Sequence, residues 1–170
     1  MDDIIKALKE LLDTAKAVPN KKLSDIKHVF NGDPYVIPEL SLPSITIDAA
    51  DESWDFRGMN LDQKTHTVHI RLVDNAKRFF DDSENTAKFD KVQFKESQRL
   101  MVGGNTGGNT DDDSIIGIIR NNPQLPLSGS NTCEIAKVVS VNYQPSTDRP
   151  FKSVEVLIVL ECLVVGSRIT

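Results

Sequence analysis

The chain has 170 residues, of which 39% are hydrophobic, 26% charged and 6% aromatic, and its formal net charge is −5. This length suits one domain with a core of its own. The acidic balance argues against a protein that grips nucleic acid through its phosphates, and no apolar stretch is long enough to cross a bilayer as a helix. Met1 is followed by Asp2 and Asp3 instead of a basic patch, so we expect no signal peptide.

The first predicted element is an amphipathic helix over residues 2–17. Charged residues occupy one side, while the other side carries apolar residues at helical spacing, namely Ile5, Leu8, Leu12 and Ala15. Two aspartates at its start suit the positive end of the helix dipole, and Pro19 and Asn20 end it. A single apolar stripe predicts that this helix lies on a sheet or on a neighbouring subunit.

Short extended pieces come next. Residues 25–30 alternate and predict a strand with one face formed by Ile26, His28 and Phe30. Residues 31–34 form a turn in which Gly32 supplies a positive φ. Pro38 and Pro43 cannot join a central ladder, so this stretch is predicted to be a loop or a sheet edge.

Two strands and a hairpin are predicted between residues 44 and 74. Residues 44–48 form a short strand with Ile45 and Ile47 on one face. A polar hairpin region over residues 51–62 leads to a strand over residues 64–74. That strand alternates: one face holds Val68, Ile70 and Leu72, and the opposite face holds Thr67, His69 and Arg71.

The middle of the chain is read as mainly helical. Residues 84–102 predict a helix, with a possible helical turn over residues 76–80 before it. The tandem GGNT repeat that follows has no apolar residue, so we expect a flexible Gly/Asn/Thr loop at about residues 103–111. Residues 111–114 then supply caps for a short helix through Arg120, which Asn121, Asn122 and Pro123 end.

Two strands close the chain. The first covers residues 133–143, with Ile135, Val139 and Val141 as its apolar side chains. The second covers residues 154–165 and is apolar on both faces except at Glu155 and Glu161. Such a strand belongs in the middle of a covered sheet or at a subunit boundary. We therefore predict a single α+β domain over residues 1–170. Its antiparallel or mixed twisted sheet is packed by the N-terminal helix and one or two central helices.

The titratable residues give weak signals of chemistry. His66 and His69 are three apart, which puts them on opposite faces of a strand, and with His28 they are expected at polar, outward-facing positions. Cys133 and Cys162 match no metal spacing and stand beside no histidine in an evident fold position. They are expected to be buried, reduced thiols in a cytosolic environment.

Motif searches find no active site. The aspartates at 111–113 fail the EF-hand template, because its twelfth position is Asn122 and not Glu. The GGNT repeat lacks the Lys-Ser/Thr of a phosphate loop, and no G-x-S-x-G is present. Glu155 and Glu161 share a strand face but lie roughly 20 Å apart, too far to act as a pair. We therefore expect no catalytic, cofactor-binding or metal-binding residues.

Five further side chains have two possible roles. Trp54 could anchor a protein contact or pack over a sheet edge. Four arginines could donate intersubunit ion pairs or remain solvated surface charges, namely Arg57, Arg71, Arg78 and Arg149.

The order of elements resembles the tail terminator (tail completion) proteins of long-tailed bacteriophages, the gpU-like family. The resemblance rests on the leading helix, the turn at residues 30–34, the proline-led strand at 42–47 and the long strand at 65–72. A helix, an N-P-x-L-like turn at Asn122-Pro123-Gln124-Leu125 and two closing strands complete it. It covers most of the chain except roughly residues 75–112.

The resemblance implies a structural virion protein of the tail and neck, assembled in the host cytoplasm, and not an enzyme. It implies a homohexameric ring at the head-proximal end of the tail that ends tail-tube polymerisation and provides the docking surface for the head and neck. The implied partners are other copies of the chain, the tail tube protein and head-closure or neck proteins. DNA would pass through the lumen without specific binding, and no membrane or cofactor is involved.

Two other functions remain open. The first is another neck component, such as a head-closure or head–tail connector protein. The second is an enzyme of small molecules or carbohydrates that uses scattered carboxylates, which would have to meet in a cleft. Tails of wrong length would favour the terminator, whereas normal tails that fail to join heads would favour the connector.

Overall fold

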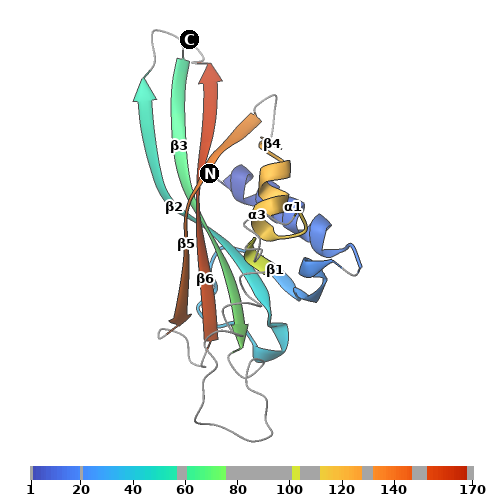
Figure 1. Cartoon of the computed structure of the whole chain (residues 1–170). Helices are drawn as coiled ribbons and strands as arrows, with labels where there is room; N and C mark the ends of the chain where they lie inside the picture. Colours follow the sequence, from blue (N-terminus) through green and yellow to red (C-terminus); the bar gives the residue numbers. More distant parts are fainter. Residues whose placement is uncertain are drawn as a thin grey trace, which may run out of the picture.

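The computed structural model describes residues 2–19, 21–56, 61–75, 101–103, 112–127, 132–146 and 153–167. Two α-helices, two 3-10 helices and six strands lie within them (Figure 1). In chain order they are α1 (Asp2–Lys16), η1 (Lys22–Asp25), β1 (His28–Asn31), η2 (Glu39–Ser41), β2 (Ser44–Phe56), β3 (Leu61–Asn75), α3 (Ile115–Asn121), β4 (Gln124–Pro126), β5 (Thr132–Ser146) and β6 (Ser153–Ser167).

The strands form one sheet in the order β1-β2-β3-β6-β5-β4. β1 pairs with β2 in parallel, and the other neighbours are antiparallel, so the sheet is mixed. β3 and β6 form its centre and pair without interruption from Leu61↔Ser167 to Asn75↔Ser153. The α+β class with a mixed, curled sheet is therefore confirmed.

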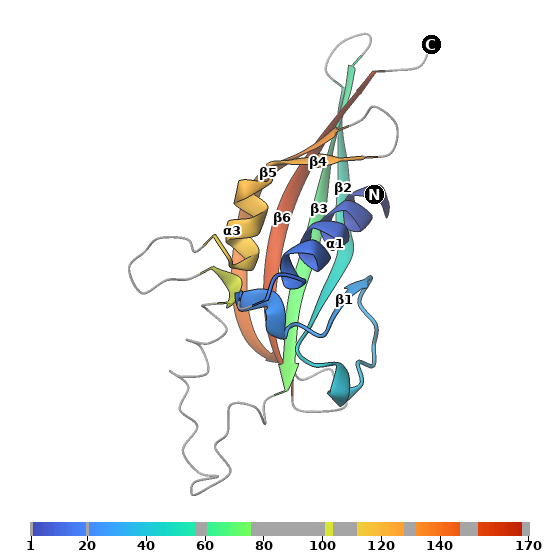
Figure 2. The same cartoon turned by 90° about the vertical axis from the view of Figure 1, so that its right-hand side faces the viewer.

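Both α-helices lie on one side of the sheet (Figures 1 and 2). α1 turns its apolar stripe to the sheet and buries Ile4, Ile5, Leu8 and Leu12, as its helical spacing predicts. These side chains join one core with the buried residues of the central strands, among them Ile70, Leu72, Ile158 and Leu160. Burying an aliphatic side chain of this size contributes about 1.5–3 kcal/mol, so each of these residues stabilises the packing of α1 on the sheet.

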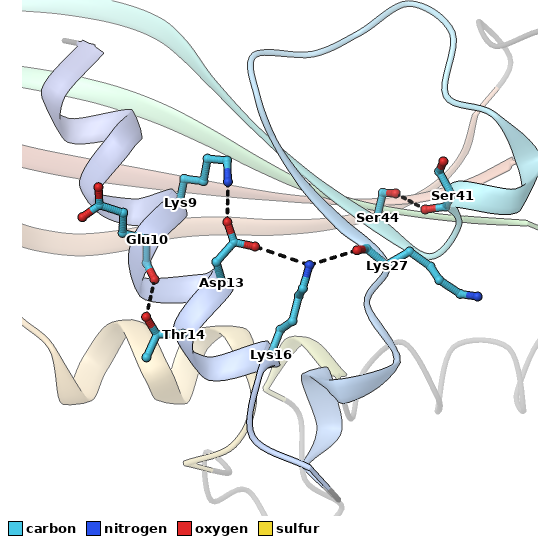
Figure 3. A network of polar contacts seen from close by, with 8 residues as sticks. All are labelled: Lys9, Glu10, Asp13, Thr14, Lys16, Lys27, Ser41 and Ser44. Carbon is cyan, nitrogen blue, oxygen red and sulfur yellow. Dashed lines mark hydrogen bonds and ion pairs between the residues drawn. The ribbon is translucent and has the colours of Figure 1, made fainter.

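Polar contacts fix the end of α1 (Figure 3). Asp13 lies between Lys9 and Lys16 and forms an ion pair with each of them. Lys16 also donates a hydrogen bond from Nζ to the main-chain carbonyl of Lys27 at 2.9 Å. Exposed ion pairs add little stability on their own. Their effect here is to hold the segment that leads into β1 against the last turn of α1.

The predicted short helix and its cap are confirmed in α3. The Ser114 side-chain oxygen accepts a hydrogen bond from the Gly117 N–H at 3.0 Å, which is an N-cap contact. Gly103 lies against this turn with φ +143°, and a Cβ there would come within 2.9 Å of the Ile116 Cβ. Only glycine permits this close approach.

The length of β2 was predicted wrongly. The sequence suggests a strand that ends at residue 48 and a hairpin from residue 51, but β2 continues to Phe56 and β3 begins at Leu61. Its second half contains Asp51, Glu52 and Asp55, which are poor strand formers. Pairing with β3 along the whole length, from Ser44↔Val73 to Phe56↔Asp62, overrides that local preference.

The alternation predicted for residues 25–30 was also wrong. Ile26 is buried but precedes the strand, and within β1 it is Val29 that is buried, while His28 is exposed. The 3-10 turn η1 changes the backbone path just before β1, so one period-two pattern cannot run through both. The predicted turn at Gly32 is confirmed by its φ of +91°.

The other predicted strands are confirmed with slightly longer bounds, since β5 and β6 extend the expected ranges at both ends. The expected helical turn at 76–80, most of the expected helix at 84–102 and the glycine loop from 104 to 111 lie outside the described residues. Met101 and Val102, the last two residues of that expected helix, are helical.

Candidate interaction surface

The two faces of β6 have different surroundings. Val156, Ile158, Leu160 and Cys162 point to the helices and are fully buried. The residues between them, Leu157, Val159 and Leu163, point to the opposite side and are only partly buried. No described helix or strand covers that side (Figure 1). The sequence predicted a strand with two apolar faces, and the structure places it in the centre of a sheet with one face covered.

This outer sheet face, which we define by the outward residues of β3, β6 and β5, is apolar along its middle and polar on both sides. On one side of the β6 residues, the register places four outward residues of β3, namely Thr65, Thr67, His69 and Arg71. On the other side of the β6 residues lie four outward residues of β5, namely Glu134, Lys137, Ser140 and Asn142. Lys137 and Glu161 form an ion pair of 3.1 Å across the β5–β6 boundary. A sheet face with an apolar centre and a polar rim has the composition of a protein interface.

An arginine-centred cluster borders the outer sheet face. Arg71 Nη1 contacts Asp33 Oδ2 at 2.9 Å and Asp48 Oδ1 at 2.6 Å, and the His69 Nδ1 lies 3.9 Å from Asp48 Oδ2. Burial raises the pKa of Asp48, although the neighbouring Arg71 and His69 charges oppose that shift. Arg71 thus pairs with two carboxylates of its own chain and is not simply a solvated surface charge, while its role as an intersubunit donor stays a prediction. Arg57, Arg78 and Arg149 lie outside the described residues.

On the helix-facing side, four polar residues form a row across four strands. His66 is the direct cross-strand partner of both Glu52 and Cys162, and Cys133 lies one diagonal step further on β5. The expectation that no histidine stands beside a cysteine was therefore wrong, as was an outward position for His66, which is 3% exposed. The register of three strand pairs brings these residues together, and no local sequence pattern carries that information.

Three members of this row, His66, Cys162 and Cys133, are buried, whereas Glu52 is exposed. The His66 Nδ1 lies 3.4 Å from Glu52 Oε2 without forming a hydrogen bond, and burial lowers the pKa of His66. Cys133 and Cys162 are free, buried thiols, as predicted. A hydrogen bond to Cys133 together with burial raises the pKa of Cys162. A thiol held protonated in this way is a poor nucleophile and a poor metal ligand.

Several apolar side chains are exposed away from the outer sheet face. Trp54 on β2 is 51% exposed, and the Lys64 Nζ lies 3.7 Å from its ring centroid. Between β1 and β2, Tyr35, Val36 and Leu40 are exposed, whereas Ile37 and Leu42 anchor the same loop in a small second core. Sequence reasoning identified a loop here but gave no indication of which side chains point outward.

Neither a cluster of metal ligands nor a membrane-spanning helix is found in the part of the chain that the structure describes. No three His, Cys, Asp or Glu residues come together there as metal ligands. None of the helices in that part has the length and apolar character needed to cross a membrane. Comparison with models of known protein families and with curated proteins finds no match for this chain.

Proposed function

We propose that this protein is a structural virion protein that forms a hexameric ring at the head-proximal end of a phage tail. The ring ends tail-tube polymerisation and offers its other side to the head and neck. The observation that carries this proposal is the outer sheet face, where the apolar residues Leu157, Val159 and Leu163 have no described cover. A subunit that assembles permanently needs a large apolar surface of this kind.

A ring also requires that the contact between subunits be of the head-to-tail kind, in which two different patches meet. Such contacts close into a ring when the rotation between copies permits, and otherwise they grow into filaments. The two sides of the described part of the molecule differ in the required way, since helices cover one face of the sheet and no described helix or strand covers the other (Figure 1). The two ends of the ring would then present different surfaces to the tube and to the neck.

The charge of the chain fits the same role. A net charge of −5 repels phosphates, so a ring of several copies is suited to DNA that passes without being held. No part of this function requires a catalytic residue.

Electron microscopy of particles made without this protein tests the proposal. We expect overlong or headless tails, because nothing would stop growth of the tube. Tails of normal length that fail to join filled heads would contradict the terminator role and would favour a head-closure or connector protein. Normal, infectious particles would exclude both.

A further inference from the structure

Two strands of the sheet have edges that are only partly paired among the described residues. β1 covers β2 from Ser44 to Ile47, so the rest of β2 has no strand on that side. β4 covers β5 only from Thr132 to Glu134, with one more backbone hydrogen bond from Ile135 to Pro123. Backbone N–H and C=O groups along such edges are templates for pairing with another chain.

The exposed part of the β5 edge has the composition of a strand made to be paired. Residues 137–144 read KVVSVNYQ, with one charge, three β-branched residues and one aromatic residue. Bulges between Ile135 and Lys137 and between Val138 and Ser140 disturb its start, but from Ser140 to Ser146 its register with β6 is regular. Natural proteins normally cover or charge an edge of this kind because it invites aggregation.

The exposed part of the β2 edge is chemically different. It carries three carboxylates, Asp51, Glu52 and Asp55, and its register with β3 is regular after the bulge at Ala49/Asp51. Two such acidic edges would repel each other if they paired, because like charges face across the ladder. The β5 edge has no acidic residue from 135 to 146 and carries Lys137, so it is the better partner for the β2 edge.

Geometry allows that partner only in another copy. The two edges lie on opposite sides of the sheet, with β3 and β6 between them, so they cannot meet within one subunit. Successive strands from β2 through β3 and β6 to β5 alternate in direction, so β2 and β5 run in opposite directions. A second copy placed beside the first in the same orientation therefore brings its β2 antiparallel to β5, which is the more stable pairing.

We infer that the β5 edge of one copy pairs antiparallel with the β2 edge of the next copy, and that this strand pairing is the head-to-tail contact of the assembly. The inference deepens the proposed function and rests on it for closure into a ring. Paired edges also bring the outer sheet faces of neighbouring copies together, so the strand pairing and the outer sheet face belong to the same contact between subunits. The unpaired parts are the C-terminal halves of β2 and β5, and they lie at opposite ends of the sheet because the two strands run in opposite directions. Strands in a closed ring would therefore be oblique to its axis.

Cysteine cross-linking tests this contact. Ser53→Cys and Ser140→Cys place thiols on the outer sides of β2 and β5, and the native cysteines are buried. The two single variants are co-expressed and treated with a short, flexible bis-maleimide. We expect a covalent dimer in the mixture and none with either variant alone. The double variant should give a ladder of cross-linked species that stops at the size of the ring. A second pair, Ser53→Cys with Asn142→Cys, samples a register shifted by two residues, and circular dichroism verifies that the variants fold.

Each outcome decides one question. A dimer with Ser140→Cys alone would show that two β5 edges pair about a two-fold axis, which overturns the inference. A ring in light scattering together with no cross-link in either pair would also overturn it, while the ring itself would stand. A wild-type protein that stays monomeric, alone and with tube protein, would remove the proposed function and this inference together.

Discussion

The two faces of the central strand β6 show how one stretch of sequence serves two purposes. The side that meets the helices carries Val156, Ile158 and Leu160 and is fully buried. The other side, with Leu157, Val159 and Leu163, has nearly the same apolar composition but remains partly exposed. Composition alone cannot tell these sides apart, since the placement of α1 and α3 makes the difference. The buried side stabilises the subunit, and the exposed side is available to other subunits.

The largest effect is expected when two neighbouring residues on opposite faces of β6 are each replaced by alanine. Ile158→Ala should lower the free energy of unfolding by about 2–5 kcal/mol, because it leaves a cavity in the core. Val159→Ala should lower it by only about 1 kcal/mol or less, because that side chain is already partly in water. Denaturant unfolding of the two variants measures both values. Equal losses would show that the outer face is as well covered as the inner one.

A charged substitution at Val159 separates the stability of the subunit from its assembly. Val159→Asp should lower the unfolding midpoint of the monomer much less than Ile158→Ala does, and it should abolish the assembled species in light scattering, because a buried unpaired charge is unfavourable at an interface. Lys6→Asp, on the exposed side of α1, is the matched control and should assemble normally. Loss of assembly in both variants would point to net charge instead of the outer sheet face.

A smaller effect is expected at the N-cap of α3, one of the two helices that cover the inner side of the sheet. Ser114→Ala removes the hydroxyl that accepts the Gly117 N–H and should lower stability by about 1 kcal/mol. Ser114→Asp should retain most of the stability, because a carboxylate can cap the same N–H group. If Ser114→Ala were as stable as wild type, α3 would be held by packing alone.

A still smaller loss of stability is expected from a substitution in the part of the sheet that extends past the helices (Figure 1). Trp54→Ala should lower the free energy of unfolding by about 0.5–1 kcal/mol, because the contact with Lys64 lies at an exposed site. Lys64→Gln in the wild-type and Trp54→Ala backgrounds completes a double-mutant cycle. A coupling near zero would assign Trp54 to contacts outside its own subunit.

The smallest expected effect is a change in pH dependence. Burial lowers the pKa of His66 in the folded state below its ordinary value of 6.5. The unfolded chain therefore takes up a proton first as the pH falls, and the stability that His66 contributes above pH 6.5 is lost below it. His66→Gln should flatten the dependence of unfolding midpoint on pH between neutral and mildly acidic conditions. An unchanged slope would mean that other groups dominate it.

Sequence reasoning succeeded where the pattern is local. The apolar stripe of α1, the Ser114 cap and the alternation of Val68, Ile70 and Leu72 all follow from spacing along the chain. Sequence reasoning failed where the pairing of distant strands determines the structure. The polar half of β2 is a strand only because β3 lies beside it, and His66 is buried only because register puts it next to Cys162.

The candidate surface was predictable only in part. The sequence of β6 shows that both of its faces are apolar, and this predicts either a covered sheet or a subunit boundary. Which of its faces stays open depends on where α1 and α3 pack, and which strand edges stay unpaired depends on how short β1 and β4 are. Neither property is visible in a periodic pattern, because both arise from contacts between distant segments.

The central claim is that copies of this chain cover one another's open sheet face by closing into a ring. Negative-stain imaging of the purified protein, combined with its mass in solution alone and with tube protein, tests it most directly. The account predicts a ring with sixfold symmetry, formed by the protein itself or on the tube. A tight dimer or a monomer under both conditions would contradict it.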